Sequence, residues 1–240
     1  MNPDAERIVE LASRASLVRK RIDDACISCG RSAASVRLVW VSKTHPIGDV
    51  EAAIVAGALD FGENKVQEGL DKFSVLRPGI ELHLIGPVQS NKWRKAAGIA
   101  QWIHSVGSRE ELSKYDAICG ELGKTLNVLV QINTSGEASK SGLCMENAEA
   151  FFENWPVFGN LKLRGLMTIG TNSGVPEDSR VGFAWLRGLR DRLQSRGGAF
   201  EFCTELSMGM TDDLEIAVAE GSTMVRVGTA IFGRRTYNLA

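Results

Sequence analysis

The chain has 240 residues, of which 44% are hydrophobic, and its 28 basic and 29 acidic side chains give a formal net charge of -1. This length is sufficient for a large single core, typically that of a barrel or another α/β fold. The charge balance favours neither nucleic acid nor an anionic membrane as a partner, and no apolar run approaches the ~18 residues of a membrane span.

The cysteines indicate a reducing compartment. The five, at 26, 29, 119, 144 and 203, are odd in number and scattered, which argues against a disulfide framework. Cys26 and Cys29 form a Cys-x-x-Cys inside a helical segment, but no second pair follows at zinc spacing, so we interpret them as weakly packed thiols. Because the N-terminus also lacks a signal-peptide pattern, we expect a cytoplasmic protein.

The predicted elements begin with a helix over residues 4–30, where apolar residues recur every three or four positions up to Gly30. Eight apolar runs then alternate with helical patterns. Ser108 and Thr211 each precede acidic residues and are predicted helix N-caps. The predicted strands are 37–41, 58–61, 81–85, 101–104, 126–132, 161–167, 202–206 and 224–227, and the predicted helices between and after them are 47–56, 64–76, 89–98, 108–123, 145–154, 177–196 and 211–220.

Eight strands with intervening helices is the count of a closed (β/α)₈ barrel. An open doubly wound sheet has the same local pattern. A nucleotide-binding sheet of that kind should carry a Gly-x-Gly-x-x-Gly turn after its first strand, and the sequence has none there. The fold class we expect is therefore α/β, with residues 1–240 forming a single TIM-type barrel domain.

Lys43 lies at the end of the apolar run that starts at Leu38. Strand alternation would place Val39, Val41 and Lys43 on one face. Desolvation beside two core valines would lower the pKa of this lysine and release the free amine, the form that condenses with a carbonyl. The alternative is that Lys43 only marks the exit of the strand into solvent.

Two glycine-containing loops follow the last two predicted strands, at 207–211 and 228–233. Barrels commonly bind phosphate there through backbone N–H groups. Arg226 on the last strand would add a charge-assisted contact. Either loop alone would also suit an ordinary tight turn. Together they favour a phosphate, and with an amine at Lys43 they favour a phosphorylated aldehyde, of which pyridoxal 5'-phosphate is the obvious example.

With these residues in place, the sequence resembles a known family, the pyridoxal phosphate homeostasis proteins, also called the proline synthetase co-transcribed or alanine racemase N-terminal-like family. The resemblance has two small departures, Pro87 where the family often has His and His45 where a lysine is frequent. The matching segments are Val41–Thr44, Phe61–Glu68, His83–Gly86, Gln89–Lys92, Ser139–Gly142, Arg164–Met167, Ser207–Met210 and Val225–Gly233.

The resemblance implies a fold type III barrel without an appended β-domain, with pyridoxal 5'-phosphate held covalently as an aldimine of Lys43. It implies phosphate contacts from Ser207, Gly228 and Thr229. Further cofactor contacts are implied for Asn64, Met208 and Arg226. The implied function is vitamin B6 homeostasis, in which the protein buffers or delivers pyridoxal 5'-phosphate and so indirectly affects amino-acid and keto-acid metabolism.

We predict little or no catalytic turnover, because racemisation needs an acid or base on both faces of the substrate. If Arg226 faces the pyridine nitrogen instead of the phosphate, its fixed charge would also weaken the ring as an electron sink. One alternative is a weak amino-acid racemase or lyase, and another is a phosphosugar enzyme that never binds pyridoxal. No second base is evident among Tyr115, Tyr237, His45, His83 and His104.

Glu63, Asn64 and Glu68 follow the second predicted strand. Glu63 and Glu68 are five apart, so we interpret them as solvated helix surface. Asn64 follows a glycine at a strand end, which suits an amide that reaches the ring hydroxyl of the cofactor. We expect a monomer with no metal and no nucleic-acid partner, whose partners are pyridoxal 5'-phosphate and the apoenzymes that use it.

Overall fold

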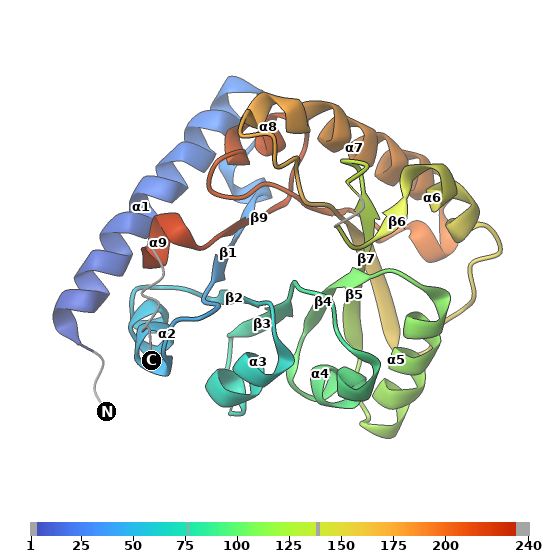
Figure 1. Cartoon of the computed structure of the whole chain (residues 1–240), viewed down its shortest axis with the longest axis horizontal. Coiled ribbons are helices and arrows are strands. Elements are labelled where there is room, and N and C mark those ends of the chain that lie inside the picture. Colours follow the sequence, from blue (N-terminus) through green and yellow to red (C-terminus); the bar gives the residue numbers. More distant parts are fainter. Residues whose placement is uncertain (1–3, 76, 138–139, 234–240) are drawn as a thin grey trace.

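The computed structural model describes residues 4–75, 77–137 and 140–233. Within them, eight parallel strands form a closed ring, in the order β4-β3-β2-β1-β9-β8-β7-β5, with β4 pairing to β5 (Figure 1). The predicted (β/α)₈ barrel is therefore confirmed. The ring strands are β1 (Arg37–Val41), β2 (Asp60–Glu63), β3 (Glu81–Leu84), β4 (Trp102–Val106), β5 (Leu126–Asn133), β7 (Leu161–Met167), β8 (Glu205–Ser207) and β9 (Met224–Val227).

Two strands start two or more residues away from their predicted positions. β2 starts two residues later than expected and includes Glu63, and β8 is a short strand that starts at Glu205 instead of residue 202. A further two-residue strand, β6 (Leu143–Cys144), pairs with β5 outside the ring. Burial decides both shifts, because the strands occupy the segments whose side chains alternate between the barrel interior and the helix layer.

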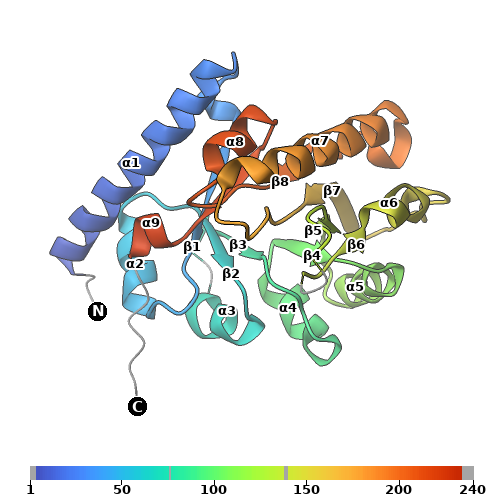
Figure 2. The same cartoon turned by 45° about the horizontal axis from the view of Figure 1, so that its top comes forward.

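The helices surround the ring (Figure 2). Ser108 caps its helix as predicted, since its side chain accepts from the Glu111 N–H in a capping box. Thr211 is not a cap: Asp213 precedes the helix and accepts from the Met210 N–H at 2.6 Å. The α-helices are α1 (Ala5–Ser28), α2 (Ile47–Val55), α3 (Val66–Phe73), α4 (Trp93–Ile99), α5 (Arg109–Glu121), α6 (Met145–Phe152), α7 (Arg180–Ser195), α8 (Leu214–Ala219) and α9 (Thr229–Phe232).

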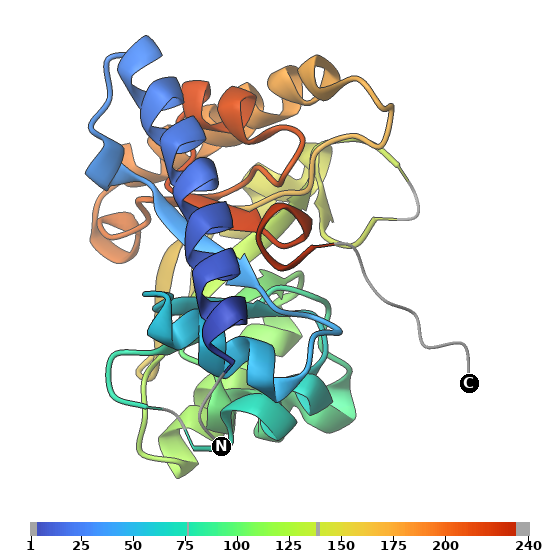
Figure 3. The same ribbon diagram turned by 90° about the vertical axis from the view of Figure 1, so that its left-hand side faces the viewer.

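Helix α1 lies across the place where the first and last strands meet. It packs on α2, α8 and α9, and Figure 3 shows it running along the front of the molecule. Leu11, Val18 and Ile22 are its fully or almost fully buried apolar residues. This helix therefore covers the seam between β1 and β9. No helix of the described residues is both long and apolar enough to cross a membrane.

The core has two layers. The barrel interior is filled by a small apolar cluster, and the space between strands and helices by larger ones. The interior cluster consists of Val39, Trp102, Leu129, Met167 and Met224. Val39 therefore faces inward, and the alternation predicted for the first strand holds for it.

Candidate functional site

The residues predicted to bind a ligand lie in the last residues of strands β8 and β9 or follow strands β1, β2, β8 and β9, so they gather at the carboxyl end of the barrel, called the rim below. Strand β1 ends at Val41, and Lys43 lies half-buried in the turn that follows. Thr44 has a φ of 68°, a left-handed conformation that a β-branched residue rarely adopts. The lysine is thus carried by a strained turn and not by the strand itself.

Gly228 brings the end of β9 against the end of β1. A Cβ at this position would lie 3.1 Å from the carbonyl oxygen of Val41, two residues before Lys43. Gly228 is followed at once by α9, in which the N–H groups of Ile231 and Phe232 donate to the Gly228 carbonyl, so the donors at the start of this helix are the N–H groups of Thr229 and Ala230. Thr229, the first residue of α9, is exposed. The structure therefore brings backbone donors of this helix close to the turn of Lys43.

Asn64 lies on the neighbouring part of the rim. Its backbone packs so tightly on the next loop that a Cβ at Gly86 would lie 2.5 Å from the Asn64 carbonyl oxygen. The Asn64 residue is exposed and lines a cavity of about 380 Å³ with Pro87, Gln89 and Lys92 among its other walls. The structure thus leaves this amide accessible at the carboxyl end of β2.

Arg226 lies inside the barrel just below the rim, and its residue is 4% exposed. Its Nη1 donates to Ser207 Oγ at 2.7 Å and its Nη2 donates to the Thr168 carbonyl at 2.9 Å. Burial lowers the pKa of Arg226 to about 10, and nearby Asp213 opposes the shift. The guanidinium remains charged at neutral pH and has further N–H groups to offer.

A buried chain of hydrogen bonds continues from Arg226 toward the other end of the barrel. Ser207 Oγ contacts His104 Nδ1 at 2.9 Å, His104 Nε2 contacts His83 Nδ1 at 2.9 Å, and His83 Nε2 contacts Asp60 Oδ1 at 3.1 Å. We call Arg226, Ser207, His104, His83 and Asp60 the column. It crosses the barrel interior from the rim to the amino ends of the strands.

The far end of the column is a cluster of charged groups. Arg37 Nη1 donates to Asp60 Oδ1 at 3.1 Å and to Glu81 Oε2 at 3.0 Å. Asp60, Glu81 and His83 each place a possible metal ligand atom within 4.8 Å of the others. The Arg37 guanidinium donates to both carboxylates, so the cluster already contains one cationic side chain.

A second network holds the segment around Lys43. Lys72 Nζ on α3 donates to Glu63 Oε1 and to the Ser42 carbonyl, both at 2.8 Å, and lies 3.4 Å from Glu68 Oε2. Ser42 Oγ donates to the same Glu63 oxygen at 2.7 Å, and Glu68 Oε2 accepts from the Thr44 N–H at 2.6 Å. We call Ser42, Glu63, Glu68 and Lys72 the clamp, because its bonds fix the backbone on both sides of Lys43.

The clamp overturns the interpretation of Glu63 as solvated surface. The Glu63 side chain is 0% exposed, and its Oε2 has no hydrogen-bond partner among the described residues. Burial raises the pKa of Glu63, and the Lys72 ammonium opposes this shift. The interpretation was wrong because Glu63 belongs to β2, where its side chain packs inside the fold, and because Lys72 joins it to Glu68 across five residues.

Several predicted residues have less direct access to the rim. Met208 is fully buried in the outer apolar layer, so its side chain packs between the strands and the helices. Ser207 is also fully buried, and its hydroxyl belongs to the column. Tyr115 lies in the outer core, and burial raises its pKa. Tyr237 and Ser139 fall outside the described residues.

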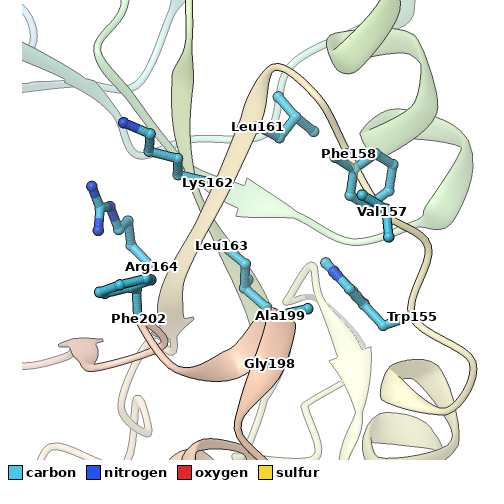
Figure 4. Close-up of a pocket in the computed structure, with 10 residues that line it drawn as sticks. All are labelled: Trp155, Val157, Phe158, Leu161, Lys162, Leu163, Arg164, Gly198, Ala199 and Phe202. Carbon is cyan, nitrogen blue, oxygen red and sulfur yellow. The ribbon is translucent and has the colours of Figure 1, made fainter.

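An apolar cavity of about 550 Å³ lies away from the rim (Figure 4). It opens beside the first residues of β7 and the segment before β8, which are at the amino ends of the strands. Figure 4 shows Lys162 and Arg164 on one side of the β7 ribbon and Leu163 and Trp155 on the other. The cavity is thus separate from the predicted site.

The column and the clamp were missed in the sequence. The signal that could have found the column is one polar residue at an inward position of each of five strands: Asp60, His83, His104, Ser207 and Arg226. The sequence does not give the pairing of neighbouring strands, so it could not show that these five positions touch. The clamp could be found only by knowing that α3 packs against the end of β2, and no local sequence pattern gives this position.

Comparison with known proteins places the chain among relatives of similar length. The family model described as "Alanine racemase, N-terminal domain" matches residues 19–236. The chain is 42% identical over 228 residues to the pyridoxal phosphate homeostasis protein of Pseudomonas aeruginosa, covering 95% of this chain and 96% of that protein. It is 40% identical to the protein of the same name from Escherichia coli, covering 95% and 98%.

Solved structures show the same fold. A structure of PipY from Synechococcus elongatus, described as having PLP bound, matches with a TM-score of 0.80 and 35% identity, covering 93% of this chain and all of that one. Alanine racemase from Bartonella henselae matches with a TM-score of 0.71 and 15% identity, covering 97% of this chain and 61% of that one. This second likeness shows a shared barrel alone.

Proposed function

The chain belongs to the pyridoxal phosphate homeostasis protein family, and on this premise we propose that it binds pyridoxal 5'-phosphate at the rim and buffers or delivers it. The observation that carries the proposal is the contact of Gly228 with the end of β1. It sets the segment that leads into Lys43 beside the start of α9. A phosphorylated aldehyde needs a lysine amine and N-terminal N–H groups of a helix at once.

The residues of the rim fit the ligand in three ways. Lys43 offers the amine that attaches to the aldehyde carbon. Gly228 and Thr229 offer backbone and hydroxyl donors to the phosphate, and the lack of a side chain at Gly228 lets the anion approach the backbone. Asn64, exposed at the end of β2, offers its amide to the ring hydroxyl.

Arg226 then faces the ring rather than the phosphate. Its guanidinium is buried inside the barrel, whereas Thr229 is exposed at the outer edge of the rim. Arginine can only donate hydrogen bonds, so the atom opposite it must be an acceptor. An unprotonated pyridine nitrogen meets that requirement, and the unprotonated ring is a weaker electron sink. This arrangement supports storage of the cofactor over its use in catalysis.

Hydride trapping tests the ligand and its attachment point together. The protein is incubated with pyridoxal 5'-phosphate, reduced with borohydride, digested with trypsin and mapped. Because a modified lysine resists trypsin, the label should appear on a peptide of residues 38–65. Lys43→Ala should remove that label, and Lys65→Ala, a change of another lysine near the rim, should retain it at Lys43. Label on another peptide, or none, would contradict the proposal.

Proton exchange separates storage from catalysis. Loaded protein is mixed with each enantiomer of alanine in deuterated water, and α-proton exchange is followed by NMR. We expect exchange no faster than with free pyridoxal 5'-phosphate, because the residues of the proposed site that the structure describes include no second acid or base. Exchange many times faster would favour the racemase or lyase alternative.

Delivery is the finer part of the proposal. We propose that the protein works as a monomer in the cytoplasm and passes the cofactor to apoenzymes. Light scattering should give the mass of one chain, 26.0 kDa. Loaded protein mixed with an apo-aminotransferase and a trap for free pyridoxal 5'-phosphate should restore activity faster than the free cofactor does. Equal rates would show that the protein only releases the cofactor into solution.

A further inference from the structure

The column occupies the centre of the barrel, where it joins side chains from β2, β3, β4, β8 and β9. Its members His83, His104 and Ser207 are all 0% exposed. Burying four polar groups in a row is costly unless each hydrogen bond is made. All four contacts of the column are within 2.7–3.1 Å, so the chain is fully connected from Arg226 to Asp60.

The two ends of the column fix the direction of every hydrogen bond in it. Arg226 can only donate, and an ionised Asp60 can only accept. Burial alone would raise the pKa of Asp60, but the contacts from His83 and Arg37 outweigh it and leave this pKa below its usual value. His83 therefore donates from Nε2 to Asp60 and accepts at Nδ1 from His104 Nε2.

The same logic determines the upper half of the column. With its proton on Nε2, neutral His104 has a lone pair on Nδ1 and accepts there from the Ser207 hydroxyl. The Ser207 oxygen in turn accepts from Arg226 Nη1. Each group thus receives one hydrogen bond from the rim side and gives one toward Asp60.

The opposite direction is unfavourable. It would place an unprotonated His83 Nε2 against the Asp60 carboxylate at 3.1 Å, or would require charged imidazoles. Burial lowers the pKa of His83 and lowers that of His104 well below its usual value, with the charge of Arg226 adding to the effect at His104. Both rings are therefore neutral at pH 7.

We propose that Asp60, His83 and His104 are positioning residues, which set the direction of the Ser207 hydroxyl and hold Arg226 in place for the ligand at the rim. The inference rests on the proposed function only for the identity of that ligand. Because the Ser207 proton points toward His104, the hydroxyl has no proton to give to a phosphate. Recognition of the phosphate then falls to Gly228, Thr229 and the N–H groups of α9, while Arg226 keeps its remaining N–H groups for an acceptor on the ring.

The first experiment uses the ligand-free protein. The chain has three histidines, and nitrogen-15 NMR of histidine-labelled protein at pH 7.5 reports which ring nitrogen carries the proton. His45→Gln removes the signals of the one histidine outside the column, and His104→Asn assigns the remaining two. We expect the Nε2–H tautomer for both His83 and His104. An Nδ1–H tautomer or a charged ring at either residue would overturn the proposal, whether or not the protein binds pyridoxal 5'-phosphate.

The second experiment measures the affinity of three variants for pyridoxal 5'-phosphate by absorbance titration. His104→Phe removes both hydrogen bonds of this ring at similar volume, and we expect affinity to fall about tenfold, the equivalent of one ordinary hydrogen bond. His104→Asn places an amide oxygen near the former Nδ1, so it should recover most of the affinity. Ile103→Ala is the control, because Ile103 lies on the same strand but packs in the outer layer.

Ile103→Ala should lower the stability while leaving affinity within about twofold, since its contacts do not reach the column. Wild-type affinity in His104→Phe, or an equal loss in Ile103→Ala, would overturn a positioning role. If His104→Phe does not fold, His104→Asn and the tautomers of the wild-type protein decide the matter. Failure of the wild-type protein to bind pyridoxal 5'-phosphate would refute the proposed function but not the tautomer assignment.

Discussion

The clamp and the column lie beneath the same rim and hold its residues in different ways. The clamp uses formal charge: the Lys72 ammonium bonds to Glu63 and lies near Glu68, and together they fix the backbone around Lys43. The column is neutral between its ends and holds a side chain, Arg226, through the direction of its hydrogen bonds. A charge pair tolerates small changes of geometry but not the loss of one partner, whereas a directional chain fails wherever one donor or acceptor is missing.

The largest expected effect is on the clamp. Lys72→Met should lower the free energy of unfolding by about 3–5 kcal/mol, because it leaves the buried Glu63 carboxylate without its cation. Urea unfolding measures the change. Adding Glu63→Gln to Lys72→Met should recover part of the loss by removing the unpaired charge.

The matched control is Lys20→Met. Lys20 pairs with Asp24, four residues away on a helix, as Lys72 does with Glu68. Both side chains of the Lys20–Asp24 pair are exposed. We expect no measurable change in stability. If Lys20→Met and Lys72→Met lower the free energy of unfolding by similar amounts, burial does not make the clamp stronger than an exposed ion pair.

Acid should weaken the column next. Both histidines have folded-state pKa values below the usual 6.5, so the unfolded chain takes up protons first as the pH falls. Their stability contribution is fully present above pH 6.5 and is lost below it, at about 1.4 kcal/mol per pH unit for each histidine. The raised pKa of Glu63 acts oppositely, since it reduces stability as the pH rises above about 4.5.

Urea unfolding between pH 7.5 and 5.5 checks the sign and the slope. His104→Phe should halve the slope that the two histidines cause below pH 6.5. The charged groups that face the histidines are Asp60, Arg37, Glu81 and Arg226. If the free energy of unfolding does not change with pH below 6.5, the two imidazole rings are not neutral in the folded protein.

Two serines allow a direct comparison of the networks. Ser207→Ala leaves both His104 Nδ1 and one N–H of Arg226 without their partner, and we expect a loss of about 1–3 kcal/mol. Ser42→Ala removes one donor to a Glu63 oxygen that Lys72 still contacts, and should cost about 1 kcal/mol. An equal or larger effect at Ser42 would reverse our view of which network depends on each hydrogen bond.

The smallest effect concerns the strained turn. Thr44 has a φ of 68°, where any side chain is unfavourable and glycine is not. Thr44→Gly should therefore be more stable than Thr44→Ala by about 1 kcal/mol, as both lack the hydroxyl and only Ala keeps the strain. Thermal unfolding of the pair measures the difference, and the reverse order would show that the turn relaxes.

The sequence predicted the barrel, because the periods of strands and helices and the glycines that end them are local signals, and the same signals gave the candidate ligand-binding loops. The same local pattern shifted β2 by two residues, which was enough to assign Glu63 to the surface instead of the interior. His83 and His104 are 21 residues apart, and only the ring of strands makes them neighbours. Residues that act through non-local pairs were therefore missed, while Lys43 and Gly228, which follow the ends of their strands, could be proposed as site residues from local signals.

The seam between β1 and β9 also has a kinetic consequence. Residues 37–40 pair with residues 224–227, so the ring cannot close until residues 224–227 have left the ribosome. Until then both edge strands are exposed to wrong pairing, and the lysine turn and Gly228 belong to separate ends of an unfinished chain. Capture of the vitamin would thus report completion of folding, and a nascent protein stalled before residue 224 should not retain it.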